Sequence, residues 1–103
     1  MQVEIALAFR MDVEAIIGWN LRRIRGEQGL SQEELALRIN IIDQAYISRV
    51  ESGRKNPTAV MLYLLASALS VGVGEFFSLD SIPKKLTSGP VIIRSSRSKK
   101  TDS

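Results

Sequence analysis

The chain has 103 residues, which is enough for one domain with one modest core. It contains neither cysteine nor histidine, and this excludes disulfides, thiolate or imidazole metal sites and catalysis that depends on either side chain. No apolar run approaches the ~20 residues of a membrane helix, and the first nine residues lack the basic region of a signal peptide. These features are compatible with a cytoplasmic protein, for which we expect neither cofactor nor metal.

The net charge of +3 is unevenly distributed along the chain. Residues 81–103 hold six basic and one acidic side chains, which gives this segment a charge of +5. A basic segment favours a polyanionic partner such as nucleic acid, because neutralised phosphates release condensed counterions. A tail that only aids solubility is the alternative interpretation.

Residues 1–11 form an N-terminal extension in which large apolar side chains occupy every second position, a period typical of a β-strand. These side chains belong to Val3, Ile5, Leu7, Phe9 and Met11. We expect a short strand, which could pair with residues 91–93 within one chain or across a dimer. A helical extension and frayed ends are the two alternatives.

A long helix is predicted from a cap at Asp12 to about Gln28. Its apolar residues recur at three- and four-residue spacing and form one stripe, which consists of Val13, Ile16, Ile17, Leu21 and Ile24. Gly29 ends this helix.

Residues 31–57 contain two short helices joined by a tight corner. Ser31, followed three residues later by Glu34, is the signature of a capping box that starts the first helix. Asp43 is a good N-cap for the second helix, which ends at Gly53. The apolar faces are formed by Leu35, Ala36 and Ile39 in the first helix and by Ile47 and Val50 in the second.

Further helical structure is predicted after this pair. Thr58 caps an apolar helix over residues 59–69, and residues 74–79 form one or two additional turns. We therefore place the folded domain at residues 12–80. Residues 81–103 form a basic, largely flexible tail with too little apolar content to pack.

These segments resemble the lambda-repressor-like helix-turn-helix domains of the Cro/repressor and XRE type. The resemblance spans residues 17–77, and its motifs lie at residues 21–25, 29–36, 46–53, 54–57 and 75–77. It implies an all-α domain of five helices, to which short terminal strands could be added. It also implies a supporting helix at residues 32–39, a recognition helix at residues 44–52 and an ion pair between Arg25 and Glu51.

Two departures from the family pattern concern the corner between these helices. Asn40 stands where the family usually has glycine, and asparagine tolerates the left-handed conformation best after glycine. Ile41 and Ile42 make the corner one residue longer than usual. We expect one isoleucine to fill the space between the helices, the other to occupy a separate pocket, and the angle between the helices to shift slightly.

A recognition helix in a major groove directs its N-terminal and outward residues to the bases. The candidate base-reading residues are Gln44, Ala45, Ser48 and Arg49. Glutamine can form two hydrogen bonds with adenine and arginine two with guanine, and alanine can contact a thymine methyl group. The candidate contacts to the DNA backbone are Gln32, Tyr46, Arg54, Lys55 and Asn56.

We expect a sequence-specific transcriptional regulator of double-stranded DNA, most simply a dimeric bacterial or phage repressor with a palindromic operator. One such domain buries only ~600–1,000 Å² on DNA, so tight binding requires two copies. The expected dimer surface involves Phe76, Phe77, Leu79 and Ile82, with the termini as an additional element. The alternative is that the two phenylalanines close the core of the single chain, and we expect at least one of them to do so. An antitoxin-like protein-interaction module is the alternative, whereas an enzyme, a membrane partner and a small-molecule effector are not expected.

Overall fold

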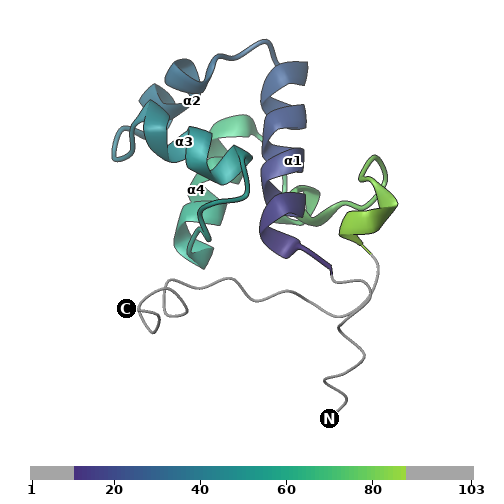
Figure 1. The fold of residues 1–103 in the computed structure, drawn as a ribbon. Helices are drawn as coiled ribbons and strands as arrows, with labels where there is room; N and C mark the ends of the chain where they lie inside the picture. The colour runs from purple at the N-terminus through teal and green to yellow at the C-terminus, as the bar shows by residue number, and fades with distance from the viewer. Residues whose placement is uncertain (1–10, 88–103) are drawn as a thin grey trace, which may run out of the picture.

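The computed structural model describes residues 11–87 (Figure 1). All secondary-structure elements in this range are helices, apart from a single bridge residue at Met11. The elements are α1 (Val13–Glu27), α2 (Gln32–Ile39), α3 (Gln44–Glu51), α4 (Ala59–Leu69) and the 3₁₀ helices η2 (Val73–Phe77) and η3 (Lys84–Leu86). The all-α prediction is confirmed. Apart from Met11, the strand predicted at residues 3–11 and its partner at residues 91–93 lie outside the described residues. None of the helices in this range combines the length and the apolar character needed to cross a membrane.

Each α-helix begins at the cap that the sequence predicts. Asp12, Ser31, Asp43 and Thr58 each accept a hydrogen bond from the backbone N–H three residues later, which satisfies a donor without an intrahelical partner. At Ser31 the Glu34 carboxylate also accepts from the backbone N–H, over 2.7 Å, and this completes the capping box. The hydrogen bonds from the Ser31 backbone and side chain hold the pKa of Glu34 below its ordinary value.

The predicted fifth helix is a short 3₁₀ helix, η2, so the domain has four α-helices within the described residues. A five-residue segment gains few i to i−4 hydrogen bonds, and the tighter 3₁₀ turn is common in such short connections. The buried amide of Asn20 supplies the missing partners, because it donates to the carbonyl oxygens of Phe76 and Ser78 over 3.0 Å each. The end of η2 is therefore held by α1.

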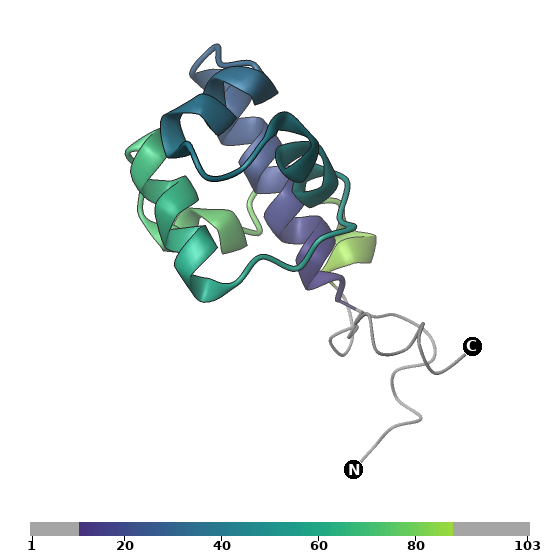
Figure 2. The same cartoon turned by 90° about the vertical axis from the view of Figure 1, so that its left-hand side faces the viewer.

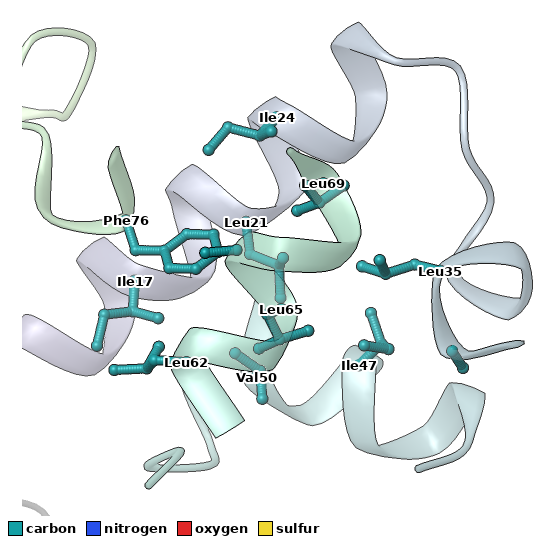
Figure 3. Packing of buried hydrophobic residues seen from close by; sticks show 12 residues of the cluster. Ile17, Leu21, Ile24, Leu35, Ile47, Val50, Leu62, Leu65, Leu69 and Phe76 are labelled. Atoms are coloured by element: carbon teal, nitrogen blue, oxygen red, sulfur yellow. The ribbon is translucent and has the colours of Figure 1, made fainter. Parts of the chain in front are cut away.

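One apolar core joins the four α-helices and η2 (Figure 3). Leu21 from α1, Leu35 from α2, Ile47 from α3, Leu65 from α4 and Phe76 from η2 are all fully buried. Burial of a large apolar side chain is worth roughly 1.5–3 kcal/mol relative to its exposure. The core therefore holds α3 against the rest of the domain through its inner face.

The chain continues along α1 beyond the predicted domain boundary at residue 80. α4 and η3 lie on opposite sides of α1 (Figures 1 and 2). Ile82 is only 8% exposed, and the carbonyl oxygen of Leu86 accepts a hydrogen bond from the backbone N–H of Asp12 over 3.0 Å. Residues 81–86, which the sequence analysis assigned to the tail, therefore pack on the domain.

This packing corrects the predicted dimer surface. Phe76 is fully buried and Ile82 nearly so, because both close the core of the single chain. Neither can offer area to a partner without unfolding its own segment. Phe77 and Leu79, which are 42% and 50% exposed, are the two predicted residues that remain on the surface.

Candidate nucleic-acid interface

α3 presents a polar outer face because its apolar residues point into the core. Ile47 and Val50 are fully buried. The residues between them and before them form the outer face, with Gln44, Ala45 and Arg49 exposed and Ser48 half-buried. These are the four candidate base-reading residues, and the structure brings them together on one side of a single short helix.

The corner before α3 adopts a left-handed turn at Asn40, whose φ is 66°. The backbone N–H of Asn40 still donates to the carbonyl oxygen of Ala36, so the turn also completes the end of α2. Ile42 is half-buried against the core, as expected for one of the two isoleucines. The expectation of a second pocket is wrong, because Ile41 is 69% exposed. The additional residue of the corner therefore lies at the surface and adds no side chain to the core.

A row of hydrogen bonds connects the exposed start of α3 with the interior of the domain. The Gln44 side-chain NH₂ donates to the Gln32 carbonyl oxygen over 2.6 Å. The Gln32 NH₂ in turn donates to Glu51 over 2.9 Å. Arg25 closes the row with two hydrogen bonds to the Glu51 carboxylate, 2.6 Å from Nε and 2.9 Å from a terminal nitrogen.

The pair of Arg25 and Glu51 lies close to the core, with side chains 15% and 5% exposed. A third hydrogen bond, of 2.7 Å, runs from Arg25 to the carbonyl oxygen of Leu30 and ties the pair to the link between α1 and α2. The hydrogen bond from the guanidinium to the carboxylate raises the pKa of Arg25, so the charge persists at every accessible pH. The two-pronged geometry fixes the end of α3 relative to α1.

Gln32 has side-chain contacts within the protein that the sequence did not predict. Its NH₂ donates to Glu51 and its carbonyl oxygen accepts from Gln44, while a contact of this residue and its neighbouring backbone N–H groups with a DNA phosphate stays a prediction. The physical reason for the contacts within the protein is the Glu51 carboxylate, which Arg25 alone leaves with unfilled acceptor positions in a nearly buried place.

The remaining backbone-contact candidates follow α3 or lie on its flank. Arg54, Lys55 and Asn56 are exposed in the segment after the helix. The Arg54 side chain donates to the Ser52 hydroxyl over 2.9 Å. The Lys55 ammonium lies 5.8 Å from the ring centre of Tyr46, in a cation–π arrangement. Tyr46 is half-buried, and this burial raises the pKa of its phenol, which stays protonated and able to donate.

Two residues that position other elements against α1 were not identified from the sequence, Gly18 for α3 and Asn20 for η2. A Cβ atom added to Gly18 would lie 2.3 Å from the Val50 carbonyl oxygen, so only glycine allows this approach of α3 to α1. Asn20 is fully buried, and its side-chain oxygen accepts two hydrogen bonds from Arg23. The signal for Asn20 was present, because a polar residue four positions after Ile16 falls on the apolar stripe of the helix.

Two short helices joined by a corner, the second with a buried inner face and a polar outer face, define a helix-turn-helix domain. The model of the helix-turn-helix family matches residues 21–76. The chain therefore belongs to this family of DNA-binding transcriptional regulators.

Comparison with individual proteins leads to the same family. An uncharacterized HTH-type transcriptional regulator, y4dJ of Sinorhizobium fredii, is 48% identical over 61 residues, which cover 59% of this chain and 78% of that protein. The control protein C.SmaI of Serratia marcescens is 38% identical over 77 residues, with 75% and 80% covered. Among solved structures, the restriction-modification controller protein C.Esp1396I, a tetramer in complex with its natural 35-base-pair operator, is similar with a TM-score of 0.57. It shares 34% identity, with 63% of this chain and 84% of that chain covered.

Proposed function

We propose that this chain is a dimeric repressor that binds a palindromic operator in double-stranded DNA through α3. The observation that carries this proposal is the row of hydrogen bonds from Arg25 through Glu51 and Gln32 to Gln44. It connects an exposed polar side chain at the start of α3 to a nearly buried ion pair. A face that served only solubility would not require such support.

The row determines which atoms of Gln44 remain for a base. A carboxylate accepts hydrogen bonds and donates none, so Glu51 selects the NH₂ of Gln32. The carbonyl oxygen of Gln32 then accepts from the NH₂ of Gln44. One N–H and the carbonyl oxygen of Gln44 remain, and this donor and acceptor match the N7 acceptor and N6 donor of adenine. Gln44 therefore reads adenine.

Arg49 and Ala45 extend the contact along the groove. Arg49 lies on the same exposed face and has the fork of donors that pairs with the O6 and N7 acceptors of guanine. Ala45 is exposed beside Gln44 and can contact a thymine methyl group. Ser48, short and half-buried at mid-helix, contributes through a bridging water.

The phosphates on both sides of the groove are contacted by groups around α3. Tyr46 offers its protonated hydroxyl, and the exposed segment of Arg54, Lys55 and Asn56 offers two cations and an amide. The first backbone N–H groups of α2 have no intrahelical partners, and the helix dipole favours an anion there. In this proposal Gln32 contributes to a phosphate contact through its backbone, since its side chain holds Gln44.

Two copies supply the affinity that one domain lacks. Specific binding by a single module of ~600–1,000 Å² is weak, whereas a two-fold dimer that spans half-sites ~34 Å apart doubles the contacts. The exposed Phe77 and Leu79 are the predicted dimer residues that the fold leaves available. The controller protein C.Esp1396I, which is similar to this chain, occupies its operator as a tetramer. The proposed location is the cytoplasm, at the nucleoid, and the proposed role is binding without catalysis.

The test is a fluorescence-anisotropy titration with DNA from upstream of the chain's own gene. Loss of one good two-pronged contact is worth roughly 1–3 kcal/mol, so Arg49→Ala should raise Kd about 5- to 150-fold. Arg22→Ala is the matched control, because Arg22 is also exposed and carries the same charge but lies on α1. Arg22→Ala should change Kd only by the effect of removing one positive charge from the domain.

The identity of the base that Gln44 reads is tested with altered DNA. Gln44→Ala should weaken binding to the natural site and lose the preference for adenine at one position of each half-site. The losses of binding free energy caused by Gln44→Ala and by the change of that adenine should therefore not be additive. Micromolar binding that is blind to sequence and insensitive to Arg49→Ala would refute the proposed function.

A further inference from the structure

An open groove of about 550 Å³ lies on the side of the domain where η3 meets α1. It runs along the first half of α1, between the end of α3 and η3, and Figure 2 shows η3 beside this part of α1. Its lining includes Ala15, Trp19, Arg22, Ser52, Ser81 and Leu86. The walls are mostly apolar, and Trp19 is 42% exposed.

The helix-turn-helix function does not account for this groove. The family model begins at residue 21 and ends at residue 76, whereas Ala15, Trp19, Ser81 and Leu86 lie outside that range. The indole N–H of Trp19 donates to the Ser81 hydroxyl over 3.3 Å, which joins the segments before and after the family match. A mostly apolar groove rimmed by polar side chains is typical of a binding site.

The described chain begins at the end of this groove. The backbone N–H of Asp12 donates to the carbonyl oxygen of Leu86, and Leu86 itself lines the groove. The groove extends from there toward Arg22, a distance of ~15 Å for ten residues of α-helix. Residues 3–9 in extended conformation span ~23 Å. The segment that precedes Asp12 is therefore long enough to cover the groove when it folds back along α1.

Pattern and charge both favour this segment as the occupant. Its apolar side chains occupy every second position, so an extended backbone presents all of them on one side. Residues 1–10 carry one acidic and one basic side chain, whereas residues 88–103 carry four basic and one acidic. Arg22 lines the groove and is exposed, whereas Arg23 and Glu51 there form ion pairs within the domain, so the groove favours the neutral segment over the basic one.

We propose that residues 3–9 bind in this groove of their own chain as an extended segment. The apolar side chains cover Trp19 and Leu86. Because Glu51 and Ser52 also line the groove, the bound segment rests on the end of α3 and supports the orientation of that helix against α1.

Trp19 is the sole tryptophan of the chain, so its fluorescence reports on the groove alone. The experiment measures quenching by acrylamide in the full chain and in two double variants. Ile5→Ser with Leu7→Ser alters the apolar side of the segment, and Ala6→Ser with Ala8→Ser is the control on the opposite side. The first variant should raise the quenching constant at least twofold and shift the emission to longer wavelength. The control should match the unaltered chain.

Equal quenching in all three proteins, with unchanged helical circular dichroism, would overturn the proposal. If the first variant lost its helical signal, the single change Leu7→Ser takes its place. Two further results also contradict the assignment. Protection of Trp19 that disappears on dilution indicates a second copy as the occupant, and protection lost only in Ile92→Ser with Ile93→Ser indicates the other end of the chain.

Discussion

Replacement of Gly18 by alanine tests how closely α3 approaches α1. Gly18 lies within α1, and the Cβ atom of an alanine there would meet the carbonyl oxygens of Val50 at 2.3 Å and Glu51 at 2.7 Å. Both are backbone atoms, so no side-chain rotation relieves the contact. The end of α3 must withdraw by at least 0.7 Å, the difference between 2.3 Å and the 3.0 Å below which such contacts are essentially absent.

The magnitude follows from two opposing contributions. Overpacking of a core costs ~1–3 kcal/mol, and a clash with fixed backbone belongs near the upper end. Alanine in a helix interior is favoured over glycine by ~0.8–1.0 kcal/mol, which leaves a net loss of about 2 kcal/mol. Gly26→Ala is the matched control, because Gly26 lies in the same helix with no atom near its missing side chain. It should gain up to ~1 kcal/mol in stability.

The assay is urea denaturation followed by circular dichroism, with DNA binding measured on the folded variants. Gly18→Ala should be about 3 kcal/mol less stable than Gly26→Ala, the sum of the loss and the gain estimated above. It should also bind the operator more weakly, because the displaced α3 carries the base-reading residues. If the two variants were equally stable, the close contact between α1 and α3 would be wrong.

Three further predictions concern the corner, a capping box and the ion pair. Ile41→Ser should change stability by no more than ~0.5 kcal/mol, since Ile41 is largely exposed. Ile42→Ser should cost clearly more, because Ile42 packs against the core. Equal losses of stability in urea denaturation would contradict the corner described above. The stability that Glu34 contributes should be complete above the ordinary glutamate pKa of about 4.3 and should disappear as the pH falls through the lower pKa of the folded state. The difference in stability between the unaltered chain and Glu34→Gln should therefore shrink on acidification. A difference that stayed constant over several pH values would contradict this role of Glu34. Glu51→Gln should lose ~1.5 kcal/mol or more in the same assay, because it replaces hydrogen bonds to a charged group, and a fully stable variant would contradict the role of the pair.

The helix boundaries were predictable because they depend on neighbouring residues. Asp12, Ser31, Asp43 and Thr58 cap helices through contacts that reach only three residues along the chain. The left-handed turn at Asn40 is equally local. The apolar stripes then identified most of the core, since burial follows helical periodicity when one face is apolar.

The errors concern contacts between distant segments. Asn20 stabilises η2 through residues more than fifty positions away, and no local pattern gives that partner. Ile82 was assigned to the tail because most of the surrounding residues are polar, yet its side chain is only 8% exposed in the folded domain. The side-chain contacts of Gln32 were not predicted, because the need of the Glu51 carboxylate for a second donor becomes visible only when the helices are packed.

The chemistry of Glu51 explains why an ion pair stands where an apolar pair could stabilise the domain equally well. Replacement of a buried ion pair by packed apolar residues is often neutral or stabilising, so stability alone does not require Arg25 and Glu51. An amide such as Gln32 can face a neighbour with either its oxygen or its NH₂, and only a group that accepts without donating forces one choice. A carboxylate is such a group, and Arg25 pairs with it in a nearly buried place. Glu51 thus fixes the orientation of the Gln32 amide, and Gln32 in turn fixes that of the Gln44 amide. Gln44 retains one N–H donor and its carbonyl oxygen, the pair of groups that adenine requires. In the proposed function the ion pair therefore serves the specificity of α3 more than the stability of the fold.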